Sequence, residues 1–229
     1  MEFSFPATIR RYYELEIPKA ARVRRRRPLL IALHGYQGNK DSMMAVASRI
    51  AAGRMVVISL QGHNEFFLRY GKKDLTDPKT FPVVFGWGTS YKMEESVRVH
   101  HEAIRYLIHL AVRKHHVDES RIFLLAFSQA CAYNYRYAFT YPNQIRGAIG
   151  VCGGVPGDWH SNPIYKAART HVLHIAATED EWYSRERNLD QRRKLAERAA
   201  SLDFRFYNSK HRFPRNSIPH IRKWIEKQL

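Results

Sequence analysis

The chain has 229 residues, 45% of them hydrophobic and 26% charged, which fits one globular domain over residues 1–229 and leaves little room for a second. No apolar run approaches the ~18 residues that a membrane-spanning helix needs, so we expect no membrane span. Lysine and arginine outnumber acidic residues by 38 to 21, a net charge of +17. The basic residues are spread along the chain without a recognisable nucleic-acid-binding module, so we do not expect nucleic acid to be the main partner.

The N-terminal sequence and the cysteines predict the cellular compartment. The N-terminal stretch has no basic segment followed by an apolar one, so no secretory signal is visible. Two cysteines, Cys131 and Cys152, are too few for a disulfide framework and have no metal-ligand spacing. These observations favour the cytoplasm. The oligomeric state is left open, a homodimer included.

The first sixty residues alternate between strand-like and helix-like patterns. Alternating apolar residues predict a half-buried strand at 8–17, and short apolar runs predict strands buried on both faces at 29–33 and 55–60. A helix is expected between the last two, at about 42–52. This alternation of strand and helix is typical of a parallel sheet.

A cluster of arginines lies between the first two predicted strands. Its members are Arg22, Arg24, Arg25, Arg26 and Arg27. Such a cluster can attract an anionic partner, such as nucleic acid or an acidic membrane surface. A solvated basic surface is the alternative interpretation.

The segment 61–90 follows neither the helical nor the strand period and is predicted to be a long irregular insertion. Thirty residues of this kind inside a compact domain are usually functional or mobile. Aromatic side chains are frequent here, and we predict that Phe66, Phe67 and Trp87 form a substrate pocket. The alternative, that these rings only pack the segment onto the sheet, stays open.

The rest of the chain continues the alternation and sets the fold class. Helices are expected at about 91–114, 129–139, 184–200 and 218–229, and strands at about 121–127, 145–154, 171–178 and 203–207. We therefore predict an α/β fold with a doubly wound, mostly parallel sheet and an antiparallel N-terminal strand pair.

One strand enters a helix through a single serine, Ser128. A serine in this turn adopts a strained backbone conformation that exposes its hydroxyl at the helix N-terminus. Small neighbours two residues away reduce crowding in such a turn, and here they are Ala126 and Ala130. The pattern A-x-S-x-A alone is weak evidence, but its strand–turn–helix setting makes Ser128 a candidate nucleophile.

A serine nucleophile needs a base, and the base needs a carboxylate to orient it. His211 follows the last predicted strand and Asp180 follows the strand before it, so the chain order is serine, acid, histidine. Ligands of such sheets bind beyond the carboxyl ends of the strands, where these residues are expected. Three other carboxylates remain alternatives for the acid: Glu179, Glu181 and Asp158.

Backbone N–H groups can stabilise the negative oxygen that forms during acyl transfer. Gln129 follows Ser128 at a helix start and can supply one N–H. Tyr36 can supply the other, because Gly35 before it permits a close approach of the backbone. We therefore predict an oxyanion hole formed by Tyr36 and Gln129.

Together, several stretches make the chain resemble the phospholipase/carboxylesterase branch of the α/β-hydrolase family. They are "LLIALHGYQGN", "VVISLQGH", "RIFLLAFSQACAYNYRYAFTYPNQIRGAIGVCGG", "HVLHIAATEDEWY" and "YNSKHRFP". Family members usually read G-F-S-Q-G around the serine, so Ala126 and Ala130 are departures. The resemblance implies an α/β-hydrolase fold and a serine esterase that acts on small carboxylic esters or thioesters without a metal or organic cofactor.

Two other functions are kept beside this one. The first is a catalytically weak or inactive α/β-hydrolase scaffold that binds an anionic partner through its basic surface. The second is a peptidase that uses the same three residues, which we rank lower because the chain shows no second domain to control peptide access.

Overall fold

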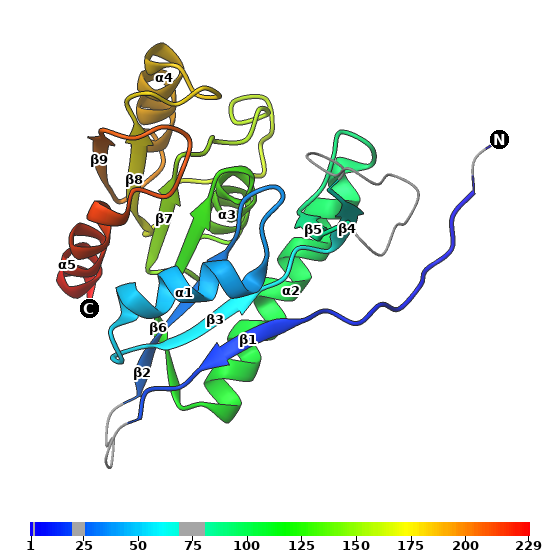
Figure 1. Ribbon diagram of the computed structural model, residues 1–229, viewed down its shortest axis with the longest axis horizontal. Helices are drawn as coiled ribbons and strands as arrows, with labels where there is room; N and C mark the ends of the chain where they lie inside the picture. The colour runs from blue at the N-terminus through cyan, green and yellow to red at the C-terminus, as the bar shows by residue number, and fades with distance from the viewer. Residues whose placement is uncertain (2, 20–25, 69–80) are drawn as a thin grey trace.

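The computed structural model describes residues 1, 3–19, 26–68 and 81–229 and contains a seven-stranded sheet (Figure 1). Its strand order is β1-β3-β2-β6-β7-β8-β9. The strands are β1 (Tyr13–Glu16), β2 (Arg27–Leu33), β3 (Val56–Leu60), β6 (Val117–Phe127), β7 (Gly147–Val151), β8 (His171–Ala177) and β9 (Ser201–Tyr207). All neighbours pair in parallel except β1, which runs antiparallel to β3. The predicted fold class, an α/β fold with a mostly parallel sheet, is confirmed.

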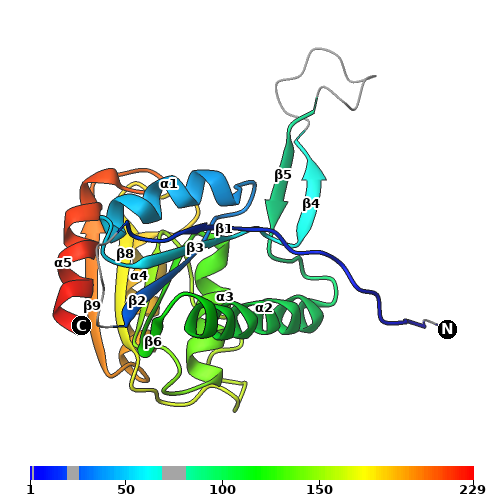
Figure 2. The same ribbon diagram turned by 90° about the horizontal axis from the view of Figure 1, so that it is seen from below.

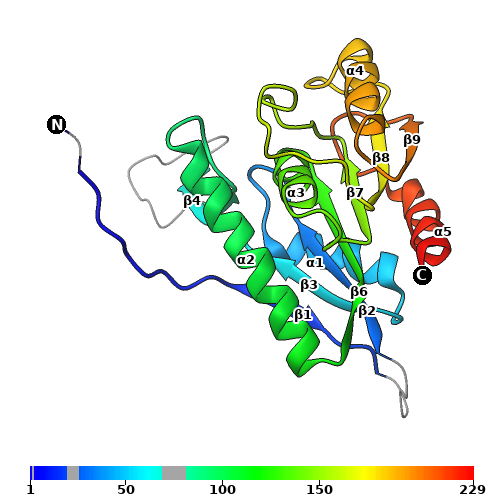
Figure 3. The ribbon, with the colours of Figure 1, turned by 180° about the vertical axis from the view of Figure 1, so that it is seen from behind.

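The α-helices of the described residues, α1 to α5, cover the two faces of the sheet, as Figures 1 and 3 show. On one face lie α1 (Lys40–Ala51) and α5 (Ile218–Gln228), and on the other lie α2 (Met93–Lys114), α3 (Gln129–Thr140) and α4 (Arg185–Ala196). Side-chain caps define two of the helix starts, because Asn39 accepts from the Ser42 N–H and Ser184 accepts from the Arg187 N–H. The stretches Leu29–Leu33 of β2 and Ile122–Ala126 of β6 are fully buried, in agreement with their wholly apolar sequences.

The first strand is shorter than predicted. The sequence pattern favoured residues 8–17, whereas β1 spans Tyr13–Glu16. Pairing limits the strand, because its ladder with β3 joins Tyr13 to Leu60 at one end and Glu16 to Val57 at the other. Residues 3–12 have no regular secondary structure, and Ile9, part of the predicted apolar face, is exposed.

The segment 61–90 contains regular structure that the sequence analysis did not predict. Strands β4 (Asn64–Phe67) and β5 (Val83–Gly86) form an antiparallel pair separate from the main sheet. In Figure 2 this pair projects from the body of the molecule. It is anchored at its base, where the Phe85 N–H donates to the Gly38 carbonyl at 3.2 Å. The run Val83, Val84 and Phe85 is rich in strand-forming residues and was the available signal.

Two sequence-based expectations concern partners outside the chain. No helix in the described part of the chain is long and apolar enough to cross a membrane. Of the arginine cluster, Arg22, Arg24 and Arg25 lie outside the described residues, while Arg26 is exposed and Arg27 begins β2.

Candidate active site

The connection between β6 and α3 turns at Ser128. This residue has φ 54° and ψ −119°, a left-handed conformation that costs free energy in any residue with a Cβ atom. Its N–H donates to the Val151 carbonyl of β7 at 2.9 Å, and its carbonyl accepts from the Cys131 N–H at 3.0 Å. Because neighbouring elements hold both sides of the turn, the strained conformation persists and the serine remains partly exposed at the strand ends.

Ala126 and Ala130, the two departures from the usual family pattern, are both fully buried in the core. Neither has a positive φ, so neither position requires glycine for its backbone conformation. The close approach occurs instead at Gly153, where an added Cβ would lie 2.4 Å from the Ser128 carbonyl oxygen. The alanines are therefore compatible with the turn that presents Ser128.

Three side chains from distant parts of the sequence meet at the carboxyl ends of the strands. Ser128 Oγ lies 2.8 Å from His211 Nε2. The other ring nitrogen, Nδ1, lies 2.9 Å from Asp180 Oδ2 and 3.0 Å from Oδ1. Ser128 follows β6, Asp180 follows β8 and His211 follows β9, so the parallel sheet brings all three to the carboxyl ends of its strands.

The Asp180 carboxylate is held in place by its own loop. Its Oδ1 accepts from the N–H groups of Trp182 at 2.9 Å and Tyr183 at 3.0 Å. The side chain is fully buried, whereas the His211 side chain is 16% exposed. A buried, hydrogen-bonded carboxylate can fix the orientation of an imidazole that remains in contact with solvent.

Aromatic rings enclose the imidazole of His211. The Tyr183 ring stacks on it with a centroid distance of 5.9 Å, and the Phe127 ring lies 5.4 Å away. The Trp182 ring contacts it edge-on at 6.4 Å and is largely exposed. These rings restrict the rotation of His211 and leave a hydrophobic surface beside it.

Of the alternative acids, Glu181 is the one that also contacts His211. Its Oε2 accepts from the backbone N–H of His211 at 3.0 Å and does not face the ring nitrogen. This hydrogen bond is the main cause of a lowered pKa at the Glu181 carboxyl. Glu179 is exposed, and its N–H donates to the Ser209 carbonyl at 3.0 Å. Both residues help to join the loops after β8 and β9.

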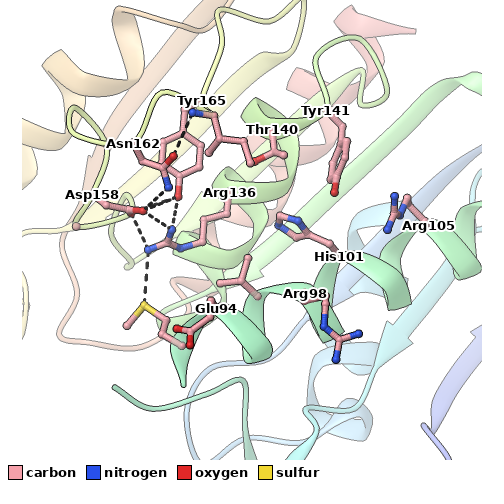
Figure 4. A pocket seen from close by; sticks show the side chains of 14 residues that line it. Glu94, Arg98, His101, Arg105, Arg136, Thr140, Tyr141, Asp158, Asn162 and Tyr165 are labelled. Atoms are coloured by element: carbon pink, nitrogen blue, oxygen red, sulfur yellow. Dashed lines mark hydrogen bonds and ion pairs between the residues drawn. The ribbon is translucent and has the colours of Figure 1, made fainter. Parts of the chain in front are cut away.

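Asp158, the remaining alternative, lies in the loop after β7 and has other partners. Its carboxylate forms an ion pair with Arg136 at 2.8 Å and also accepts from the Asn162 amide and the Tyr165 hydroxyl (Figure 4). An acid occupied by a guanidinium cannot orient the imidazole of another loop. The geometry therefore favours Asp180 over Asp158.

The two predicted oxyanion donors, Tyr36 and Gln129, directly follow Gly35 and Ser128, which lie close together. A Cβ atom at Gly35 would lie 3.1 Å from Ser128 Cβ and 2.7 Å from the Phe127 ring, so glycine allows the loop that carries Tyr36 to approach the serine. Gln129 is the first residue of α3, where N–H groups lack intrahelical acceptors. Neither the Tyr36 nor the Gln129 N–H donates a backbone hydrogen bond to another described residue outside the helices and strands.

The three predicted pocket aromatics lie in different environments. Phe66 stacks on the exposed ring of Tyr36, with centroids 5.0 Å apart, and Phe67 is half exposed beside Phe81. Trp87, in contrast, has no exposed surface, and its Nε1 donates to the His34 carbonyl at 2.7 Å. The assignment of Trp87 to a substrate pocket is therefore wrong, because a core side chain offers no surface to a ligand.

Sequence reasoning missed two sets of polar contacts that shape this edge. The Gln129 side chain accepts from the Trp87 N–H at 3.0 Å and donates to the Gly88 carbonyl at 2.8 Å, which joins the turn at Ser128 to the residues after β5. His34 Nε2 accepts from the Gly62 N–H at 2.9 Å. Burial lowers the pKa of His34, so the ring is neutral and can accept this bond. A polar residue next to a candidate nucleophile was the only sequence signal for the first contact.

Potential metal ligands do not cluster in the part of the chain that the structure describes. Within the described ranges, no group of three or more histidine, cysteine or acidic side chains is arranged to hold a metal ion.

Comparison with solved structures identifies proteins of the same fold. The carboxylesterase from Mesorhizobium loti matches with a TM-score of 0.73 and 20% identity, over 94% of this chain and 94% of that chain. The carboxylesterase from Bacillus cereus matches with a TM-score of 0.70 and 18% identity, over 96% and 95%. SOBER1 from Arabidopsis thaliana matches with a TM-score of 0.68 and 16% identity, over 88% and 99%. No curated protein sequence matches the chain.

The family itself is shown by sequence. The family model described as Phospholipase/Carboxylesterase matches residues 19–229, which is most of the chain and includes every residue of the candidate site. The resemblance found in the sequence motifs is thereby confirmed. The chain belongs to the phospholipase/carboxylesterase family of α/β-hydrolases, which are esterase-type hydrolases.

Proposed function

We propose that this protein is a serine hydrolase that cleaves carboxylic esters, thioesters included, through Ser128, His211 and Asp180. The observation that carries the proposal is the hydrogen-bonded series from Ser128 Oγ to His211 Nε2 at 2.8 Å and from His211 Nδ1 to Asp180 at 2.9 Å. Membership of the phospholipase/carboxylesterase family supports the same chemistry.

Each residue has a defined role in this mechanism. His211 removes the proton from Ser128 while Oγ attacks the carbonyl carbon, and Asp180 orients the imidazole and stabilises its charged form. The N–H groups of Tyr36 and Gln129 donate to the negative oxygen of the tetrahedral intermediate. Its collapse breaks the bond to the alcohol or thiol, which leaves with the proton from His211 and yields an acyl-enzyme.

The second half of the reaction repeats these roles with water. Water attacks the acyl carbonyl while His211 takes a proton from it. His211 then returns this proton to Ser128 Oγ when the acid is released. No metal or organic cofactor is required. The Trp182 ring contacts His211 and is largely exposed, and the ring of Tyr36, a proposed oxyanion donor, is also exposed. The substrate we propose is therefore a small molecule with an apolar acyl or alcohol group.

The test is hydrolysis of p-nitrophenyl acetate by the wild-type protein and by Ser128→Ala. The matched control is Ser161→Ala, which alters an exposed serine in the loop after β7. We expect Ser128→Ala to lose activity by about 10³-fold or more and Ser161→Ala to retain it.

The inactive-scaffold alternative makes the opposite prediction. Wild type and Ser128→Ala would be equally slow, and binding to an anionic matrix would collapse with added salt. That result would reject the esterase proposal. A fluorogenic aminopeptide substrate in the same assay tests the peptidase alternative.

A further inference from the structure

The structure contains a cavity that none of Ser128, His211 and Asp180 lines. It has a volume of about 610 Å³ and is bordered by α2, α3 and the loop after β7 (Figure 4). This volume is in the range of small-molecule sites. The sites described above make no use of this cavity.

The charges around this cavity are unequally compensated. Arg98 pairs with Glu95 and Glu102, and Arg136 pairs with Asp158. Arg105 forms no ion pair with any residue that the structure describes; instead its guanidinium lies over the Tyr141 ring, 5.2 Å from the centroid. Arg105 is therefore the cavity's uncompensated cation.

The acidic residue Glu94 also lines the cavity but lies at its other end. Glu94 and Arg105 are eleven residues apart on α2, which corresponds to roughly 16 Å along the helix. Glu94 lies in the first turn of α2, and Arg105 lies beside Tyr141 (Figure 4). The end of the cavity at Arg105 is thus positive, because the negative charge of Glu94 is too far away to neutralise it.

Between these ends the charged lining residues Arg98, Arg136 and Asp158 are all ion-paired, and much of the remaining wall is apolar. Val97 and Ile164 contribute aliphatic surface, and Tyr165 contributes an aromatic face. His101 lies in the middle, and burial together with the neighbouring Arg105 and Arg136 lowers its pKa to about 4, so its ring is neutral at pH 7. A ligand that fits this cavity has one anionic group and an apolar body.

We propose that this cavity binds a small amphipathic carboxylate, with the carboxylate against Arg105 and the apolar body along Val97 towards Ile164. A carboxylate accepts charge-assisted hydrogen bonds from a guanidinium in a fixed planar geometry. The apolar body gains free energy by displacing water from the aliphatic and aromatic wall. This site is independent of the proposed esterase activity.

The test measures octanoate binding by calorimetry at low ionic strength with four variants. Arg105→Gln removes the cation, and Arg113→Gln is its matched control two turns further along α2, outside the cavity. Val97→Phe fills the cavity without changing its charge. Ser128→Ala shows whether octanoate binds at the catalytic serine, and octylammonium is the ligand of opposite charge.

We expect Arg105→Gln and Val97→Phe each to weaken octanoate binding by about tenfold. Arg113→Gln and Ser128→Ala should bind as wild type does, and octylammonium should bind more weakly than octanoate. The proposal is wrong if octanoate does not bind, if Arg105→Gln and Arg113→Gln behave alike, or if Val97→Phe binds normally. Equal binding of octylammonium would also reject it.

Discussion

Two aspartates follow neighbouring strands of the same sheet and have different surroundings. Asp180, after β8, meets the imidazole of His211 at 2.9 Å, whereas Asp158, after β7, meets the guanidinium of Arg136 at 2.8 Å. Asp180 is also held by two backbone N–H groups of its own loop, and Asp158 by the side chains of Asn162 and Tyr165.

The role of each aspartate therefore depends on the side chain that it contacts, and not on its position after a strand. An arginine stays protonated at all accessible pH values, so the Asp158 pair holds structure together and moves no proton. A histidine can gain and lose a proton near neutrality, so the same type of carboxylate beside it can take part in catalysis. Each prediction below tests one side of this contrast.

The largest expected effect is that of Asp180→Asn on turnover. An asparagine keeps the size of the side chain but cannot favour the correct imidazole tautomer or stabilise its charged form. We expect kcat for p-nitrophenyl acetate to fall by about 10³- to 10⁴-fold. A decrease of less than about tenfold would mean that another group orients His211.

Asp158→Asn should have the opposite profile. We expect kcat to stay within about twofold of wild type, because the partners of Asp158 are Arg136, Asn162 and Tyr165 and not His211. The free energy of unfolding should fall by about 1–2 kcal/mol, because Arg136 is mostly buried and loses its counter-ion. Urea denaturation measures this loss, and a strongly reduced kcat in a fully folded variant would contradict the assignment.

A histidine can move protons near neutrality only where its charged form is stable, and burial prevents this at His174. His174 is buried in the middle of β8, where burial lowers its pKa from 6.5 to about 3. The folded protein keeps this ring neutral while the unfolded chain takes up a proton below pH 6.5, so stability is lost as the pH falls from 6.5 towards 3. At pH 5 this residue alone should contribute a slope of about 1.4 kcal/mol per pH unit.

Replacing that ring tests its contribution. His174→Asn should flatten the dependence of the unfolding free energy on pH between 6.5 and 5 by about this slope. The control is His109→Asn, at an exposed position on α2, which should keep the wild-type slope. An unchanged slope in His174→Asn would contradict the neutral, buried state.

The smallest expected effect is that of Glu181→Gln. Its side chain accepts from the backbone of His211, and glutamine retains an oxygen that can accept the same bond. We expect kcat to change by less than about threefold. A loss comparable to that of Asp180→Asn would assign the role of the acid to Glu181.

Much of the fold could be predicted from local patterns. The run at Leu29–Leu33 is wholly apolar and the run at Val56–Leu60 is apolar except for Ser59. Both have the composition of strands buried on both faces, and both lie inside the sheet. The β4–β5 pair was missed because short strands outside the core lack the alternating period of a half-buried sheet. The extent of β1 depends on its pairing with β3, which no local pattern contains.

The candidate site was predictable in part for similar reasons. Ser128, Asp180 and His211 were chosen by their positions after strands, and the structure brings them together at the strand ends. Trp87 was misplaced because a large aromatic ring in a long loop has the same sequence signature whether it is buried or exposed. Phe66 and Phe67 remain predicted pocket residues, and the oxyanion role of Tyr36 and Gln129 also remains a prediction.

The central claim, that Ser128 is the nucleophile, is tested most directly by covalent labelling with a fluorophosphonate probe and peptide mapping. We predict one label, on the peptide that contains Ser128, and loss of this label in Ser128→Ala or after prior denaturation. Labelling of any other serine, or no labelling of the folded wild-type protein, would contradict the account.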